Sequence, residues 1–568
     1  MKLFIKRYLP DYILKILRQN VFLSHFQYRI KFWLIIQKRL KKQLLETNKS
    51  VKKDNGINLR KVMIPLIETN HYQYLQILIT AKALQLRGAE VKVLICGQAL
   101  DGCEIKSLRM EYDKDPCWTC RYNERNVLPL FGLDIVRIDD ILTKDEIKEI
   151  DTRVNRITDF GKKIIINEEI DLTQCIEDSV TRYFFGGLPS NLEALRKVQV
   201  AHTKTAIMNA KIAKRMDQTW TPDVVFNNMG CYSTWEAYFK YYDSNGNRFC
   251  TMSITPLDYK CIRFNLPNLF QSSQRFELYK NSRIQLKITE AERDVLLKFL
   301  QNRFSGQSKI FRDLGVFDIS SLKNQHLIEK LALNFEKRNI FLFPNIHWDV
   351  GLSANGALYS NVIDWTLDTI NLAKDFNNCH IYIKPHPAEF YGNSSLKGVA
   401  DYIKEKYPML PDNVTIITPT WKINPYDLFP FIDVGVIFTG TLGLEMMLKG
   451  IPVVSTGLTS HKGLGLALEP NNVDDYSKLL QDDISSPKID RDFLELFAYF
   501  YFIKTLMPWR LTKQAYADDF NGFCFQSLED IMPGSDPYLD HLCKCILDLD
   551  NAMPEAWPPG HKIENSLN

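Results

Sequence analysis

The hydrophobic pattern of this chain alternates between two lengths. Short β-branched runs at 62–67 and 91–96 flank a longer amphipathic stretch at 74–87, which Gly88 ends, and this order predicts a strand–helix–strand unit that begins near residue 60. The run at 339–343 opens a second series of the same kind. The pattern therefore predicts an α/β protein with two domains of Rossmann type.

The stretch 381–457 carries the clearest signals. A short apolar strand at 381–383 stops at the sequence Lys-Pro-His-Pro, residues 384–387, and the two prolines leave the backbone around His386 little freedom. The imidazole of His386 is therefore expected to be held in one direction at the end of a strand.

A small-residue turn is the second signal in this stretch. A buried strand at 434–438 leads into the turn at 439–443, a helix at 444–449 that Gly450 ends, and a strand at 451–454. Free backbone N–H groups and the positive end of a helix dipole meet at such a turn, so the pattern suits a bound phosphate.

Together these two signals resemble the nucleotide-sugar half of GT-B glycosyltransferases, and more narrowly the capsule polysaccharide biosynthesis proteins. The matching residues are His386 and Pro387 for the His-Pro motif of that family, and Thr439, Gly440, Thr441 and Glu445 for its Ser/Thr-Gly turn before a Glu-bearing helix. The loop 345–349 followed by Trp365 extends the resemblance, which covers roughly 59–130 and 335–545. The resemblance implies the GT-B arrangement, in which two Rossmann-like domains face a cleft.

The reaction implied by the resemblance moves a sugar from a nucleotide-sugar donor to a surface (capsular) polysaccharide or a lipid-linked acceptor. Negative charge then develops on the nucleotide phosphate, and no Asp-x-Asp pair stands at a strand end in the second domain, so no catalytic cofactor or metal is expected to stabilise it. The residues expected to bind the donor are Lys384, His386, Pro387, Thr439, Gly440, Thr441, Gly443 and Lys462, with Glu445 on the ribose hydroxyls and Trp348 and Asp349 in the preceding loop. Trp348 suits stacking on a base or sugar, and core packing is the alternative.

The acceptor side is expected in the first domain, beyond the carboxyl ends of its strands. Glu68, Asn70 and His71 follow the first strand, and Asn228 follows the strand at 223–226. Glu68 and His71 are the candidates for the general base that takes the acceptor proton, and His386 is the third candidate catalytic residue. The alternative for His71 and Asn228 is a structural role at the start of the next helix.

Four cysteines form a group in the first domain. Cys117 and Cys120 have the Cys-x-x-Cys spacing of half a tetrahedral zinc site, and Cys96 and Cys103 are the other pair. A structural zinc that braces a loop is one interpretation, and four structural thiols are the other.

The remaining pattern divides the chain into segments. These are a basic amphipathic helical extension with a linker (1–56), an acceptor domain (57–335) with a helical insert at about 140–218, a nucleotide-sugar domain (336–484), helices that pack back on the first domain (485–552) and a polar tail (553–568).

Charge is unevenly distributed along the chain. Residues 1–53 contain 14 Lys or Arg and 2 Asp or Glu, a net charge of +12, while the other 57 basic and 65 acidic residues give −8. A basic extension with an aromatic face is typical of a helix on an anionic membrane, although packing on the protein's own surface is the alternative. The acidic remainder argues against nucleic acid as a partner.

No secretory signal and no transmembrane helix are expected, and 12 cysteines without a signal favour a reducing compartment. The expected location is therefore cytoplasmic, with peripheral contact at the inner face of the cell membrane. Three other functions fit the pattern: a CDP-polyol phosphotransferase of the teichoic-acid type, a GT-B-like sugar-nucleotide epimerase, and a non-catalytic membrane-associated assembly protein. Nucleotide binding separates the enzymes from the last of these.

Overall fold

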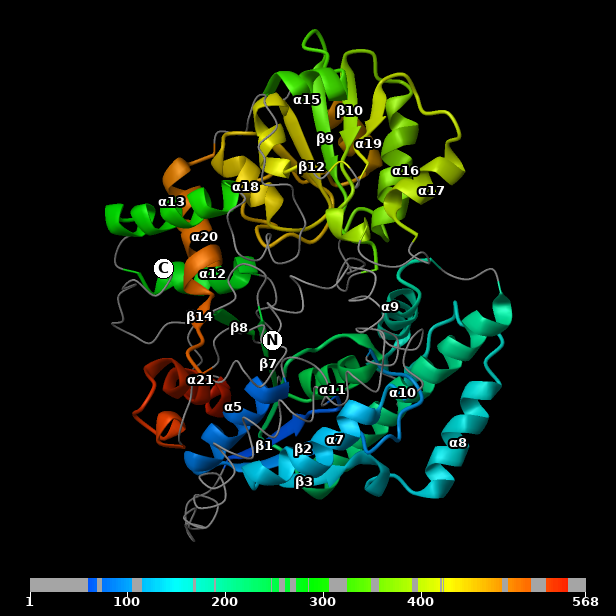
Figure 1. Ribbon diagram of the computed structural model, residues 1–568, viewed down its shortest axis with the longest axis vertical. Coiled ribbons are helices and arrows are strands. Elements are labelled where there is room, and N and C mark those ends of the chain that lie inside the picture. Colours follow the sequence, from blue (N-terminus) through cyan, green and yellow to red (C-terminus); the bar gives the residue numbers. More distant parts are fainter. Residues whose placement is uncertain are drawn as a thin grey trace, which may run out of the picture. The chain divides into compact units, whose positions relative to one another are not determined.

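A computed structural model describes residues 60–68, 74–104, 115–166, 170–187, 191–246, 248–254, 261–265, 272–283, 286–305, 324–348, 357–390, 397–418, 421, 423–482, 489–511 and 528–549. The expected N-terminal extension (1–56), the tail (553–568) and the candidate residues Asn70, His71 and Asp349 lie outside this part of the chain. The described residues divide into two compact units (Figure 1).

Unit 1 is built from three stretches of the chain: the described parts of Met1–Tyr183, Arg196–Pro267 and Met507–Asn568. In this part of the structure seven strands form one sheet in the order β14-β8-β7-β6-β1-β2-β3. The strands are β1 (Lys61–Pro65), β2 (Glu90–Ile95), β3 (Asp134–Arg137), β6 (Val224–Asn227), β7 (Phe249–Ile254), β8 (Cys261–Asn265) and β14 (Met507–Pro508). The pairs from β3 to β7 are parallel, whereas β8 runs antiparallel to both β7 and β14.

The helices that accompany this sheet are α5 (Tyr74–Leu86), α7 (Trp118–Asn126), α8 (Lys144–Asn155), α9 (Thr173–Tyr183), α10 (Leu192–Thr219), α11 (Tyr232–Ser244) and α21 (Pro537–Leu547), with the 3-10 turns η2 (Leu128–Phe131), η3 (Ile138–Asp140) and η10 (Leu528–Ile531). A short antiparallel hairpin, β4 (Ile165–Ile166) and β5 (Ile170–Asp171), lies between α8 and α9. The stretch expected to be a helical insert therefore contains three helices and this hairpin.

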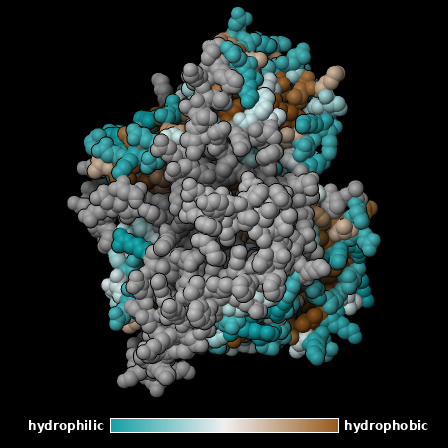
Figure 2. Space-filling model, in the orientation of Figure 1, coloured by the Kyte–Doolittle hydropathy of each residue, from teal (hydrophilic) through white to brown (hydrophobic). Residues whose placement is uncertain are grey.

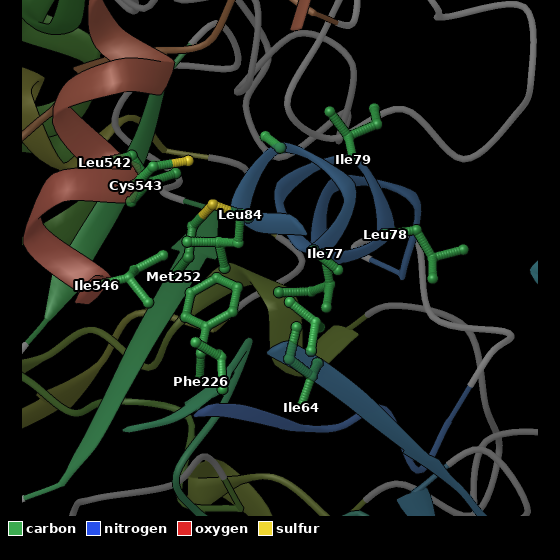
Figure 3. Packing of buried hydrophobic residues seen from close by; sticks show 14 of the residues in the cluster. Ile64, Ile77, Leu78, Ile79, Leu84, Phe226, Met252, Leu542, Cys543 and Ile546 are labelled. Carbon is green, nitrogen blue, oxygen red and sulfur yellow. The ribbon is translucent and has the colours of Figure 1, made fainter. Parts of the chain in front are cut away.

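The core of unit 1 lies between α5 and the sheet. Figure 3 shows Ile77 and Leu84 of α5 directed toward Ile64 of β1 and Phe226 of β6, and all four are fully or almost fully buried. Helix α21 adds Leu542, Cys543 and Ile546 to the same cluster (Figure 3). The C-terminal part of the chain thus completes the core of the first domain, because its apolar face covers α5 and the strands.

Unit 2 contains the described parts of Phe184–Leu195 and Asn268–Leu506. Its five strands pair in parallel in the order β11-β10-β9-β12-β13. They are β9 (Arg338–Phe343), β10 (Cys379–Ile383), β11 (Val414–Ile416), β12 (Val434–Ile437) and β13 (Val453–Ser455). The remaining elements are α12 (Ser272–Asn281), α13 (Glu290–Phe304), α15 (Asn324–Leu331), α16 (Val362–Ala373), η5 (Pro387–Phe390), α17 (Val399–Lys406), η7 (Pro425–Phe431), α18 (Leu442–Leu448), α19 (Val473–Gln481), α20 (Arg491–Tyr499) and the π-helical turn η8 (Phe500–Lys504).

Helices cover both faces of this second sheet. Trp365 of α16 and Tyr476 of α19 belong to the cluster that covers Val434 and Val436 of β12, and the Trp365 indole N–H donates to the Tyr476 hydroxyl over 3.1 Å. Helix α18 covers the other face, where the Gly435 backbone lies against Met446. Parallel strands with helices on both faces confirm the expected fold class of two Rossmann-like α/β domains.

The division between the units differs from the expected boundary near 335, because residues 268–331 belong to unit 2. The reason is an aromatic contact that local sequence does not reveal. Phe276 of α12 packs against Phe497 of α20 and Phe500 of η8, with ring centroids 5.0 and 5.5 Å apart. Helix α20 likewise belongs to unit 2, and the chain rejoins unit 1 at β14.

The surface of the described residues is mainly hydrophilic on the face that Figure 2 shows. This agrees with a charged share of 24% in the whole sequence. The informative polar side chains are instead those buried at the ends of the strands, because burial of a polar group requires a partner or a function.

Candidate functional site

The strand order of unit 2 reverses direction between β9 and β12. From β9 the chain adds β10 and β11 on one side and then β12 and β13 on the other. The strands end level with one another, since Leu342 pairs with Ile383 and Phe343 pairs with Ile437. In an open α/β sheet, ligands bind in the crevice beyond the carboxyl ends at such a reversal.

The turn after β12 lies at this reversal and is fixed by the end of β9. The backbone N–H of Thr439 donates to Oδ1 of Asn345 over 3.0 Å. Gly440 has a φ of +102°, and a Cβ there would lie 3.3 Å from Nδ2 of Asn345. Only glycine adopts this conformation without strain, so the residue type that sequence singled out is required by the backbone.

Gly443, by contrast, is explained by packing. A Cβ at this position would lie 2.2 Å from Cδ1 of Ile437, so glycine lets α18 approach β12 closely. Thr441 precedes the helix, and its side chain makes no capping hydrogen bond. Helix α18 contains only seven residues, which is too short to supply a strong dipole by itself.

Lys384 stands at the end of β10, and 6% of its surface is exposed. Within the described residues, the structure records no ion pair and no side-chain hydrogen bond for its ammonium group. Burial lowers the pKa of Lys384 to about 8, so the group still carries a positive charge at pH 7. A buried cation without a counter-charge is costly, and an anionic ligand would offset that cost.

His386 follows two residues later, and Pro387 begins η5. The His386 side chain reaches solvent, yet the protein around it and the charge of Lys384 lower its pKa to about 4. The imidazole is therefore neutral at pH 7, able to donate one hydrogen bond and accept another.

Glu445 lies on the first turn of α18, as the resemblance implies, but its carboxylate is turned into the protein. Its side chain is 1% exposed, Oε1 accepts from Nε of Arg303 over 2.8 Å, and Oε2 accepts from the Tyr426 hydroxyl over 2.8 Å. Both carboxylate oxygens thus bind side chains of the protein itself. The expectation that Glu445 contacts ribose hydroxyls is not supported by this geometry, and a role in holding α18 explains the residue instead.

Trp348 is buried and packs edge-on against two rings. Its ring centroid lies 6.2 Å from that of Phe185 and 4.8 Å from that of His347. A Cβ at Gly186 would lie 1.8 Å from Nε2 of His347, so the 184–187 segment comes close to this loop only because glycine stands there. These contacts correspond to the core-packing alternative for Trp348.

A buried carboxylate lies beside His347. Oε1 of Glu389 is 3.8 Å from Nδ1 of His347, and Oε2 accepts the backbone N–H of Val399 over 3.1 Å. Burial raises the pKa of Glu389. Through Val399, at the start of α17, this carboxylate fixes the segment that follows the His-Pro motif.

The loop after β13 contains several buried polar side chains. His461 is fully buried and Thr459 is 6% exposed, while Lys462 is half-buried. Burial lowers the pKa of His461 to about 4, which leaves the ring neutral at pH 7. Lys462 therefore lies in the expected loop, directly after a neutral histidine.

In unit 1, the strand order reverses between β1 and β6, and Glu68 lies just beyond the end of β1 with 4% of its surface exposed. Glu104, from the loop after β2, is 7% exposed. Burial first, and then the charge of Glu68, raises the pKa of Glu104 to about 8. At neutral pH, Glu104 therefore holds a proton beside the ionisable Glu68.

A chain of hydroxyl groups leads to Glu104. The Ser179 hydroxyl donates to Oε1 of Glu104 over 3.0 Å and lies 3.1 Å from Oγ of Ser233. Nδ1 of His202 lies 2.8 Å from the same Ser233 oxygen. Sequence analysis missed Glu104, Ser179, Ser233 and His202, because they come from four separated elements and form no local motif.

Asn228 lies at the end of β6, 4% exposed, with its backbone N–H donating to the side chain of Asn227 over 2.7 Å. Its place beside the β1–β6 reversal agrees with the expectation of a position near the acceptor site. Its role stays a prediction.

The four cysteines singled out in the sequence all lie in the described part of unit 1. Within the described residues, which include all four, no group of three or more His, Cys, Asp or Glu side chains is arranged to hold an ion. Cys117 and Cys120 lie at the start of α7, and burial raises the pKa of Cys96 at the end of β2 to about 11. The structural zinc and the four structural thiols therefore both remain predictions.

None of the helices in the described residues combines the length and the apolar character that crossing a membrane requires.

No family model matches the sequence. No curated protein matches it either. Among solved structures, similarity is found to "Thermosulfurimonas dismutans KpsC, beta Kdo 2,4 transferase", with 15% identity over 49% of this chain and 79% of that chain and a TM-score of 0.33. Similarity is also found to the glycosyltransferase SnogD from Streptomyces nogalater (14% identity, 78% and 94% covered, TM-score 0.20) and to UDP-GlcNAc 2-epimerase from Neisseria meningitidis (11%, 78% and 99%, 0.25). Scores of this size carry no assignment of activity, so the function must be argued from the residues of this chain.

Proposed function

We propose that this protein is a glycosyltransferase that takes a sugar from a nucleotide-sugar donor and transfers it to a polysaccharide or a lipid-linked acceptor. The proposal depends chiefly on Lys384. Its side chain is 6% exposed at the carboxyl end of β10, beside the reversal of the sheet, and the structure records no counter-charge for it among the described residues. The phosphate of a nucleotide sugar is the anion that best suits this position.

The turn after β12 supports the same ligand. Gly440 is exposed in the turn that follows β12, and Asn345 fixes the start of this turn by accepting the Thr439 N–H. Phosphate oxygens commonly accept hydrogen bonds from the backbone N–H groups of such a turn. In this proposal the Thr439 hydroxyl and the backbone of Gly440 and Thr441 bind the phosphate, and Lys384 offsets its charge.

The reaction requires that the bond between the sugar's anomeric carbon and the phosphate oxygen breaks while the acceptor oxygen forms a new bond to that carbon. Lys384 stabilises the charge that develops on the phosphate leaving group. The neutral imidazole of His386 donates a hydrogen bond to the same group. The acceptor proton passes to a carboxylate, and we propose Glu68 for this role because it lies at the corresponding reversal of the first sheet.

The test is a release assay with the full chain. The protein is incubated with UDP-, CMP- and GDP-linked sugars and a polysaccharide or lipid-linked acceptor, and the released nucleotide is measured. We expect release with one nucleotide class, an acceptor-dependent increase, and loss of at least a hundredfold in His386→Ala.

His380 provides the matched control. It lies on the same strand as the motif, at the opposite end, and its Nε2 is 2.8 Å from Oγ1 of Thr415. His380→Ala is expected to retain release, and its unfolding temperature reports whether the strand survives the loss of an imidazole. Equal release by His386→Ala and the wild type would remove His386 from the mechanism.

A further inference from the structure

Polar side chains without partners gather in the loop after β13. Oγ of Ser455, Oγ1 of Thr459, Oγ of Ser460 and both ring nitrogens of His461 are buried, and none has a hydrogen-bond partner in the part of the chain that the structure describes. Ser455, Thr459 and His461 expose 4%, 6% and 0% of their surfaces. We refer to these four residues as the β13 cluster.

Such groups need an explanation, because a buried donor or acceptor loses its hydration on folding and normally gains a protein partner in return. A single orphaned hydroxyl is unremarkable. Four residues within seven consecutive positions, one of them a fully buried histidine, indicate that the partner is something other than the described protein groups.

The backbone of the loop is well anchored. The Thr456 N–H donates to the carbonyl of Ile437 over 3.1 Å, and a Cβ at Gly457 would lie 2.3 Å from the carbonyl oxygen of Phe438. The loop is also closed on itself, since the Leu464 N–H donates to the carbonyl of His461 over 3.1 Å. The side chains therefore lack partners although the backbone that carries them is held tightly against β12.

The cluster lies at the same sheet edge as the proposed phosphate site. Strand β13 pairs with β12, whose end carries the turn at Gly440, while Lys384 ends β10 on the other side of β9. A ligand whose phosphate lies near Lys384 and Gly440 can thus extend its next group toward β13.

We propose that the β13 cluster binds the uncharged, hydroxyl-bearing ring of the donor, either the ribose or the transferred sugar. This inference rests on the proposed function. A hydroxyl both donates and accepts, and so do serine, threonine and neutral histidine, so the two sets match. The cluster contains no cation to offset an anion, and its five polar atoms exclude an apolar group.

The titration of His461 supports this choice. Burial lowers the pKa of His461 to about 4, so the ring is neutral at pH 7 and offers one donor and one acceptor. The competing explanation is a set of ordered water molecules that satisfy the same atoms without any ligand.

The two explanations predict opposite effects of Thr459→Val. If the hydroxyl is kept for a ligand, the free protein gains stability when the orphaned group becomes a methyl of the same shape, and the unfolding temperature of the unliganded protein rises. At the same time the affinity for the donor falls about tenfold, the loss expected for one hydrogen bond. Ser455→Ala is a second variant with the same expectation.

Thr369→Val is the matched control. Thr369 is fully buried in the same unit, but its hydroxyl donates to the Trp365 carbonyl over 2.7 Å and lies 2.9 Å from the Tyr476 hydroxyl. Its replacement should lower the unfolding temperature and leave the donor affinity unchanged.

Calorimetric titration with four classes of probe identifies the ring: nucleotides (UDP and CMP), their sugar conjugates, nucleosides (uridine and cytidine), and pyrophosphate. If Thr459→Val binds nucleotides and sugar nucleotides alike about tenfold more weakly than the wild type does, the cluster binds the ribose. If only the affinity for sugar nucleotides falls, the cluster binds the transferred sugar. Pyrophosphate should bind the variant and the wild type equally.

The inference is overturned if Thr459→Val binds every probe as tightly as the wild type and lowers the unfolding temperature as Thr369→Val does, since ordered water then accounts for the cluster. If the wild type binds no nucleotide probe, the proposed function fails as well, and the two failures are thereby distinguished.

Discussion

The guanidinium Nε of Arg303 donates to Oε1 of Glu445 over 2.8 Å, and both side chains are buried although 142 positions separate them in the sequence. The other end of the same helix is also held, because Arg491 donates to the carbonyl of Leu448 over 2.8 Å and to Glu495 over 2.7 Å. Helix α18 is therefore fixed at both ends by arginines from α13 and α20. Its position determines where the Gly440 turn lies.

Removing Arg303 should be strongly destabilising. In Arg303→Met the Glu445 carboxylate stays buried without a counter-charge, and a loss of about 3 kcal/mol of unfolding free energy is expected. Denaturant unfolding of the full chain, followed by circular dichroism, measures this loss.

The paired variant Arg303→Met with Glu445→Leu should recover most of that stability, because no buried charge remains. If the double variant is as unstable as Arg303→Met, shape rather than charge explains the contact, and the account of Glu445 as a structural anchor is incorrect.

Gly440→Ala should weaken nucleotide binding. At a φ of +102° a Cβ costs about 1 kcal/mol in strain, and it also lies 3.3 Å from the Asn345 side chain that fixes the turn. Gly450→Ala is the control, because Gly450 has a φ of +80° but nothing within 4 Å of a Cβ. Both variants should lose similar stability, and only Gly440→Ala should lose affinity in calorimetric titration.

The stability of the first unit should fall with rising pH because of Glu104. Burial and the charge of Glu68 raise the pKa of Glu104 to about 8, above its ordinary value of 4.5. The stabilising effect of the protonated form is complete below pH 4.5 and is lost as pH rises from there through pH 8. The charge of Arg182 lowers the pKa of Glu104, and the charge of Asp178 raises it.

Glu104→Gln removes this dependence, since the amide resembles the protonated acid and still accepts from Ser179. We expect the variant to match the wild type in unfolding free energy near pH 4 and to exceed it by about 4 kcal/mol at pH 8. Thermal unfolding at a series of pH values tests this expectation, and parallel curves for the two proteins would refute it.

Acid should destabilise the second unit through His461. Its folded pKa of about 4 lies below the ordinary value of 6.5, so its contribution is complete above pH 6.5 and is lost as pH falls from 6.5 to 4. The Gln side chain in His461→Gln cannot take up the proton. Between pH 7 and pH 5 this variant should therefore lose about 2 kcal/mol less unfolding free energy than the wild type. Unfolding temperatures at pH 7 and pH 5 measure the difference, and an equal loss in both proteins would show that other groups cause it.

The parts of the site that could be predicted from the sequence are those that a local pattern of neighbouring residues determines. The strand before Lys384 and His386, the glycine at position 440 and the strand–turn–helix order all follow from local pattern, because proline, glycine and β-branched residues fix the backbone directly. Glu68 was placed correctly at a strand end for the same reason.

What sequence did not predict depends on contacts between distant segments. The hydrogen bond from Arg303 to Glu445 joins positions that are 142 residues apart, and no local pattern around Glu445 indicates it. The division into units differs from the expected boundary near 335, because the rings that join α12 to α20 lie more than 200 positions apart. Periodicity contains no information about such pairings.

The central claim is that a buried, unpaired Lys384 binds the phosphate of a nucleotide sugar. Calorimetric titration of UDP, CMP and GDP and their sugar conjugates into the wild type, Lys384→Met and Lys374→Met tests it most directly, with Lys374 an exposed lysine of the same unit as control. We predict that one nucleotide class binds the wild type and Lys374→Met equally, that Lys384→Met binds it at least tenfold more weakly, and that Lys384→Met is itself no less stable without ligand. Equal affinity in all three proteins, or no binding to the wild type, would contradict the account.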